Sequence, residues 1–334
     1  MAEQTDTAPG ARPSTTPAAN GGDVTVFSGS AHPEFARRMC DLLGVELSPA
    51  VTDRFSNDCL QVQLQANCRR RDVYIVQPLV PPVQENLVEL LLMLDAARGA
   101  SAAHVTAVIP HFSYARSDKK DDSRISIGGR LVADLLVASG ATRVLTMALH
   151  SPQVHGFFSV PVDHLTAVNE LARYFAGNGR DLSNTVVVSP DLGNAKVATQ
   201  LARLLGVPVA AGQKQRLADD RVVIDSIVGE VAGKDVIVLD DEIANGGSMA
   251  EIVRVLRQQT DGSIAIACTH GLFTGSAIER LTGLGLDEIV TTDTVPLTPD
   301  KQLPAMTVCS VAPLFAEAVR RTNCGESVST LFDS

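Results

Sequence analysis

The sequence predicts an α/β protein of two tandem domains, each with a mostly parallel sheet flanked by helices. Short, nearly all-apolar runs such as Val24–Phe27, Val73–Val76 and Val105–Ile109 alternate with amphipathic stretches. Such runs are typical of strands that helices bury on both faces. The length of 334 residues suits two domains of ordinary size, each with its own core.

A repeated unit supports the two-domain interpretation. In the first half, the expected strand Asp72–Val76 leads through a loop and a helix to the strand Val105–Ile109. In the second half, Asp235–Leu239 leads in the same way to Ile264–Cys268. This strand–loop–helix–strand order, present twice in one chain, indicates a duplicated domain.

Composition narrows the class of protein. Hydrophobic residues make up 45% of the chain and charged residues 20%, while the formal net charge is −10. These values are typical of a globular protein and disfavour a nucleic-acid binder, although a small site can still bind an anion through local Lys and Arg. The six cysteines form no CxxC pair and lie among aliphatic residues, which favours reduced thiols and a cytoplasmic location.

The beginning of the chain differs from the rest. Residues 1–22 are rich in Ala, Pro, Thr and Gly and contain no continuous apolar segment, so we expect a disordered tail and no signal peptide. No apolar run in the sequence approaches the length needed to span a bilayer, so we expect no contact with membranes.

The loops of the two repeats differ in chemistry. The first, Gln77–Pro82, has neither an acidic residue nor a glycine, whereas the second runs from Asp240 to Ser248 as DDEIANGGS. Two carboxylates at the end of a strand can accept hydrogen bonds from a sugar diol. Glycines before a helix let backbone N–H groups approach a phosphate. An acidic strand end followed by a glycine turn and a Ser N-cap is the structural alternative.

This second loop resembles the phosphoribosyl-diphosphate loop of phosphoribosyltransferase folds, and several other segments resemble the ribose-phosphate diphosphokinases (PRPP synthetases) in the same order. The segments are Arg54–Asn57, Pro110–Lys120, Leu149–His150, Gly156–Phe158, Pro161–Asp163, Val188–Asp191, Ala316–Arg321 and Glu326–Ser329. The resemblance covers the chain from residue 24 onward. It implies an N-terminal phosphoribosyltransferase-like domain with the ATP loop at 23–167 and a C-terminal one with the sugar-phosphate loop at 168–334.

The resemblance also implies a reaction. A Mg²⁺-dependent enzyme would move the diphosphoryl group of ATP onto the anomeric hydroxyl of ribose 5-phosphate or a related furanose phosphate, and AMP would leave. Lys214 and Arg216 match the family's catalytic Lys-x-Arg and would stabilise charge on the transferring group. Without the resemblance, the two would be solvated charges on a hairpin. The sugar phosphate would bind to a set from the second loop: Asp240, Asp241, Ala244, Asn245, Gly246, Gly247 and Ser248.

ATP and metal residues follow from the same resemblance. Phe55, Asn57 and Cys59 match the family's adenine pocket, with Cys59 in place of a usual Glu. In the family a neighbouring subunit contributes to that pocket, so we expect a homo-oligomer based on dimers, with a hexamer as one form. The implied ATP-loop residues are Arg116, Ser117, Asp118, Lys119 and Asp121. His150 and Asp191 match positions expected to bind Mg²⁺.

Some positions depart from the family pattern, which leaves alternatives open. Ala244 and Asn245 replace the usual Asp-Thr of the sugar-phosphate loop, and Ala148 replaces an Asp. The chain is therefore either an active enzyme with an altered sugar pocket or a catalytically weak regulatory subunit of a PRPP synthetase. An altered pocket predicts that a ketohexose 6-phosphate competes with ribose 5-phosphate as acceptor, whereas neutral drift predicts no such change. A phosphoribosyltransferase shares the loop but does not explain the two domains.

Overall fold

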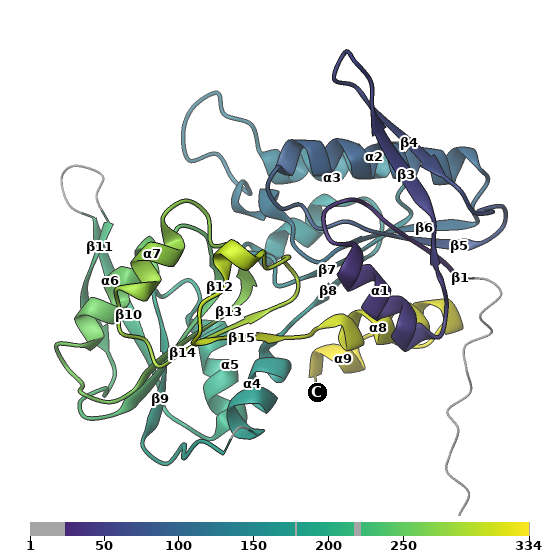
Figure 1. Ribbon diagram of the computed structural model, residues 1–334. Coiled ribbons are helices and arrows are strands. Elements are labelled where there is room, and N and C mark those ends of the chain that lie inside the picture. Colours follow the sequence, from purple (N-terminus) through teal and green to yellow (C-terminus); the bar gives the residue numbers. More distant parts are fainter. Residues whose placement is uncertain (1–23, 178, 217–221, 334) are drawn as a thin grey trace, which may run out of the picture.

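The computed structural model describes residues 24–177, 179–216 and 222–333 (Figure 1). The predicted α/β class is confirmed, because two mostly parallel sheets are each covered by helices. The expected tail at residues 1–22 lies outside the described residues. No helix in the described part of the chain is long and apolar enough to cross a membrane.

The first sheet has the strand order β2-β1-β5-β6-β7-β8 in the described part of the chain, and every pairing is parallel. Its strands are β1 (Val24–Ser28), β2 (Leu47–Ser48), β5 (Asp72–Val76), β6 (His104–Ile109), β7 (Arg143–Met147) and β8 (Val162–Leu165). The helices α2 (Val83–Gly99) and α3 (Gly128–Ser139) cover one face. The antiparallel hairpin of β3 (Ala50–Arg54) and β4 (Leu60–Leu64) stands out beyond α2 (Figure 1).

The second sheet has the order β11-β10-β9-β12-β13-β14-β15 among the described residues, and only β11 pairs antiparallel. Its strands are β9 (Thr185–Ser189), β10 (Val209–Arg216), β11 (Val222–Val228), β12 (Asp235–Ile243), β13 (Ile264–Gly271), β14 (Glu288–Thr292) and β15 (Met306–Cys309). The helices α4 (Val168–Gly177) and α5 (Ala195–Leu205) cover one face, and α6 (Gly247–Leu256) and α7 (Ala277–Thr282) cover the other. The repeated unit of the sequence thus corresponds to β5-α2-β6 and β12-α6-β13.

The C-terminal helix returns to the first sheet. The helix α8 (Ala312–Cys324) lies beside α1 (Pro33–Leu43) on the face opposite to α2, and the short α9 (Thr330–Asp333) follows (Figure 1). The rings of Phe35 and Phe315 meet edge to face at 5.3 Å between centroids, and both are fully buried. Residues from both ends of the chain therefore complete the N-terminal core. The boundary expected at 167/168 falls between β8 and α4 and stays a prediction.

This packing predicts that Phe315→Ala destabilises the fold by about 3–5 kcal/mol, the usual cost of removing a buried ring. The free energy of unfolding, from a denaturant titration, measures the loss. Leu42→Ala on the exposed side of α1, where the side chain is 56% exposed, is the matched control. Equal losses in the two variants would show that α8 does not form part of the core.

Candidate functional site

The loop predicted to bind the sugar phosphate joins the end of β12 to α6, at the carboxyl end of the second sheet. Gly246 has a φ of 73°, a left-handed conformation that glycine adopts without a steric penalty, and it caps the N-terminus of α6. The Oδ1 atom of Asn245 accepts a hydrogen bond of 3.0 Å from the backbone N–H of Gly247. The loop therefore presents backbone donors at a helix N-terminus, where the helix dipole favours a bound anion.

A hollow of about 130 Å³ borders this loop. Most of its lining comes from the predicted sugar-phosphate residues, and Arg116 joins them from the N-terminal domain. Asp240 and Glu242 both line it because side chains two apart on a strand share a face, whereas Asp241 does not. The structure therefore brings Arg116 together with Asp240, Ala244, Asn245, Gly246, Gly247 and Ser248.

The pKa values of the adjacent carboxyl groups of Asp240 and Asp241 are shifted in opposite directions. Burial, followed by the charges of Asp241 and Asp191, raises the pKa of Asp240 well above its ordinary value. Burial acts in the same direction on Asp241. Its hydrogen bonds with His150 (2.6 Å between Nδ1 and Oδ2) and Asp240 outweigh burial and lower its pKa. Asp241 therefore ionises readily, whereas the charged form of Asp240 is unfavourable unless a cation binds beside it.

Predicted metal ligands surround this pair without forming a finished metal cage. No three His, Cys, Asp or Glu side chains of the described residues converge as metal ligands would. Asp191 accepts a hydrogen bond of 3.1 Å from the Asn194 N–H, and its charge acts on Asp240. Because Mg²⁺ prefers oxygen ligands and keeps several waters, a site with a few carboxylate oxygens such as those of Asp191 and Asp240 fits it.

A carboxylate from one domain binds two side chains of the other. Glu242 accepts a hydrogen bond of 3.0 Å from Nε2 of His111 and lies 3.0 Å from Nη2 of Arg116. Its side chain is only 8% exposed, so these two donors compensate most of its desolvation. The pKa of Glu242 is lowered, since the hydrogen bond and charge of His111 and the charge of Arg116 outweigh burial. Sequence reasoning missed both Glu242 and His111.

His270 joins the two domains a second time. Its ring packs on that of His111, with 4.8 Å between centroids, and its Nε2 lies 3.2 Å from the carbonyl oxygens of Met147 and Ala148. The carbonyl oxygens require a donor at Nε2, and Nδ1 lies 2.8 Å from the Thr294 hydroxyl oxygen. Complete burial lowers the pKa of His270 to about 3.

The rest of the ATP loop does not reach the hollow. Arg116 ends the short helix η1 (Ser113–Arg116). Beyond it, the Ser117 hydroxyl accepts from the Gly128 N–H at 2.8 Å, and Asp118 accepts from Gln153 at 2.6 Å. Lys119 and Asp121 form an exposed ion pair of 3.2 Å.

The predicted adenine residues lie away from this site in the single chain. Phe55, Asn57 and Cys59 belong to the tip of the β3–β4 hairpin, and none of them lines the hollow. The Phe55 side chain is 51% exposed, and Oδ1 of Asn57 accepts from the Cys59 N–H at 3.2 Å. An exposed aromatic ring on a projecting hairpin is available to contact another molecule.

The predicted catalytic pair belongs to β10. Lys214 pairs with Ile224 and Arg216 with Val222 of β11, and the register shifts between Gln213 and Lys214. The side chains of Lys214 and Arg216 lie outside the described residues, so their catalytic role stays a prediction.

The buried histidines predict a loss of stability in acid. His164, whose Nε2 accepts from the Leu149 N–H at 2.8 Å, has its pKa lowered to about 4 by burial. Folded His164 and His270 therefore bind no proton at pH 5, while the unfolded chain does below about pH 6.5. Each of these two histidines should lower the free energy of unfolding by about 2 kcal/mol when the pH falls from 7.5 to 5. The raised pKa of His150, caused first by its hydrogen bond with Asp241, acts in the opposite direction.

Denaturant titrations at both pH values measure this loss. His270→Gln should lose about 2 kcal/mol less than the wild type on acidification. Leu42→Ala, which removes no titratable group, is the control and should keep the wild-type pH dependence. An unchanged pH dependence in His270→Gln would contradict the assignment of a neutral buried ring.

Comparisons with known proteins agree with this geometry. Residues 24–140 match the model for the N-terminal domain of ribose phosphate pyrophosphokinase, and residues 218–333 match the phosphoribosyl synthetase-associated domain. A Streptomyces coelicolor protein is 63% identical over 93% of this chain and 98% of its own. The Deinococcus radiodurans ribose-phosphate pyrophosphokinase is 49% identical over 92% and 98%. The crystal structure of Mycobacterium smegmatis phosphoribosylpyrophosphate synthetase, 38% identical, superposes with a TM-score of 0.85 over 91% of this chain and 99% of its own.

Proposed function

This chain belongs to the ribose-phosphate pyrophosphokinase family, and we propose that it transfers the diphosphoryl group of ATP to the anomeric hydroxyl of ribose 5-phosphate, with release of AMP. One observation carries the proposal. The hollow beside the DDEIANGGS loop joins the Asp240 carboxyl group, helix N-terminal donors and Arg116 from the other domain. Such transfer depends on positioning and on neutralising phosphate charge, and this hollow offers groups for both.

The sugar phosphate would bind at the loop. Asp240 would accept a hydrogen bond from a sugar hydroxyl in the hollow, and the backbone N–H groups of Gly246, Gly247 and Ser248 would receive the phosphate. Asp241 pairs with His150 and does not line the hollow, so its predicted contact with the second hydroxyl has no support from the hollow. Asn245 already occupies the Gly247 N–H with its Oδ1, so a phosphate oxygen would compete with that side chain. A preference for a ketohexose 6-phosphate remains a prediction that rests on Ala244 and Asn245.

ATP would bind from the side of the N-terminal domain. Arg116 would neutralise phosphate charge, and Ser117, Asp118, Lys119 and Asp121 would form the covering loop. The exposed hairpin tip with Phe55, Asn57 and Cys59 would reach the adenine of a neighbouring subunit. This exposure supports a homo-oligomer, with dimers as its basis and a hexamer as one form.

A magnesium ion fits the carboxylate-rich side of the site. His150 and Asp191 would hold it, and the uncompensated charge of Asp240 gives a reason for a cation to bind there. When bound, Mg²⁺ supplies charge neutralisation to the phosphate oxygens. Lys214 and Arg216 would add positive charge where it develops on the transferring group and the leaving oxygen.

ATP labelled at both its β- and γ-phosphates tests the reaction type. Both labels should appear on ribose 5-phosphate while AMP accumulates, and Lys214→Ala should lower kcat by roughly 10²-fold or more with little change in KM. Fructose 6-phosphate, assayed in parallel, tests the alternative acceptor. Formation of ADP would rule out diphosphokinase chemistry, and ATP binding without any turnover would favour the regulatory-subunit alternative.

The Glu242 contact predicts a change in ATP affinity. Because Glu242 holds the guanidinium group of Arg116, ATP must compete with a buried carboxylate for that cation. Glu242→Gln removes the charge, so KM for ATP should fall by roughly 3- to 10-fold, as for the loss of one charge-assisted contact. Steady-state kinetics measure the change. Glu170→Gln, which removes an ion pair with Arg173 on α4, is the matched control. A raised or unchanged KM for ATP would mean that Arg116 does not receive the phosphates.

A further inference from the structure

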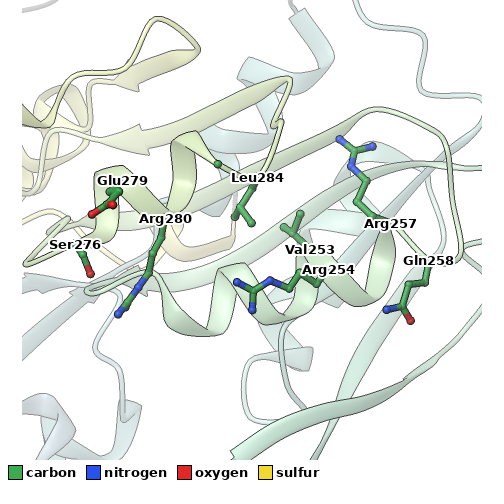
Figure 2. Close-up of a pocket in the computed structure, with 9 residues that line it drawn as sticks. Val253, Arg254, Arg257, Gln258, Ser276, Glu279, Arg280 and Leu284 are labelled. Carbon is green, nitrogen blue, oxygen red and sulfur yellow. The ribbon is translucent and has the colours of Figure 1, made fainter.

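A second, larger hollow lies between α6 and α7, outside the proposed active site. It encloses about 700 Å³, within the range of small-molecule sites. Figure 2 shows the Arg254 side chain reaching from α6 toward Arg280 of α7, with Val253 and Leu284 nearby. The helix that lines this hollow is α6, whose N-terminus caps the sugar-phosphate loop.

The charge of this hollow is opposite to that of the whole chain. Arg254, Arg257 and Arg280 line it against a single carboxylate, Glu279, which leaves an excess of two positive charges. The formal net charge of the chain is −10. A concentration of guanidinium groups on an acidic protein attracts anions locally, because clefts lined by one sign of charge focus the field.

Two of the three guanidinium groups are held in place but keep their charge. Arg257 donates to the carbonyl oxygens of Gly262 at 2.7 Å and Gly285 at 2.8 Å, and Arg280 donates to that of Asn245 at 2.8 Å. Carbonyl oxygens orient a guanidinium group without neutralising it, and each group has five donors in all. The nearest carboxylate, that of Asp287, lies 3.8 Å from Arg257 and is half exposed.

The third guanidinium group is available. Arg254 has no hydrogen-bond or ion-pair partner among the residues that the structure describes. The Ser276 hydroxyl and the Gln258 amide add neutral donors to the lining, and Val253 and Leu284 add an apolar surface. Oriented cations, spare planar donors and a small apolar area together suit a phosphate group, which Arg binds through paired N–H donors.

We propose that the hollow between α6 and α7 binds a small phosphate-bearing anion and couples its binding to the sugar-phosphate loop. The coupling element is Arg280, which donates to the carbonyl oxygen of Asn245, while the Asn245 side chain accepts from the Gly247 N–H. An anion that draws the guanidinium group of Arg280 toward itself weakens the first of these contacts and changes the loop. Linkage requires that a sugar phosphate in the loop alter anion affinity by the same factor.

Isothermal titration of the full-length protein with inorganic phosphate, pyrophosphate and AMP tests the binding step. The three anions separate a free phosphate site from one that needs a diphosphate or a nucleoside. Arg254→Gln should weaken one class of binding sites roughly tenfold, the effect expected from one charge-assisted hydrogen bond. Arg203→Gln is the matched control, since Arg203 is also an exposed arginine in the last turn of a C-terminal-domain helix. Equal affinities in the two variants for all three anions would overturn the proposal.

The coupling step rests on the proposed function and has its own readout. Binding of ribose 5-phosphate, measured by titration with and without the anion, should change by a few-fold in the wild type and in Arg203→Gln. At an anion concentration near the wild-type dissociation constant, the change should be much smaller in Arg254→Gln, because most of its sites are then empty. Anion binding that depends on Arg254 but leaves sugar-phosphate affinity unchanged would overturn the coupling and keep the site. If the proposed function itself is wrong, the wild type will fail to form AMP from ATP and ribose 5-phosphate. That result is distinct from a failure of the coupling.

Discussion

The buried carboxylate of Glu242 is the contact on which the arrangement of the site depends. It belongs to β12 of the second domain and binds His111 and Arg116 of the first. A carboxylate that is nearly excluded from water is tolerated only when donors replace its hydration, and here both donors come from the other domain. Because Glu242 belongs to the Asp240–Ser248 loop segment, the position of one domain relative to the other is tied to that loop. His270, which donates to the carbonyl oxygens at the end of β7, fixes the same interface from β13.

This interface explains why the two carboxyl groups of the loop differ. Asp241 faces His150 of the first domain, and that hydrogen bond keeps it ionised. Asp240 lines the hollow, and its burial, followed by the neighbouring charge of Asp241, raises its pKa. A strand directs consecutive side chains to opposite sides, so these two neighbours lie in different surroundings. Asp241 is readily ionised, whereas ionised Asp240 would be stabilised by a bound cation. A metal cation bound beside Asp240 would offset the penalty on its charged form.

Local sequence patterns were sufficient for the sheets and for the loop, because both depend on residues close in the chain. Buried strands such as Val105–Ile109 contain apolar runs, and the glycine at 246 marks the left-handed turn before α6. The contact between Glu242 and His111 spans 131 positions, and no periodicity records a partner that far away. The alternation of β12 places Glu242 on the same side as Asp240, which was the one signal that it belongs to the site. The predicted role of Phe55 involves a second subunit, and its exposed ring makes no contact with the hollow of its own chain.

The departure from the family pattern at Asn245 concerns hydrogen bonding as well as space. Its Oδ1 accepts from the Gly247 N–H, and its backbone carbonyl accepts from Arg280. The side chain of Asn245 therefore occupies an N–H donor that a sugar phosphate would need. Its backbone carbonyl is bound by Arg280, a guanidinium group of the second hollow. A substitution here changes which N–H groups are free before any ligand arrives, and the cost of freeing them adds to the cost of binding. Because that cost would depend on Arg280 as well as on Asn245, the choice of acceptor would be a property of α6 and α7 together with the predicted sugar-phosphate loop.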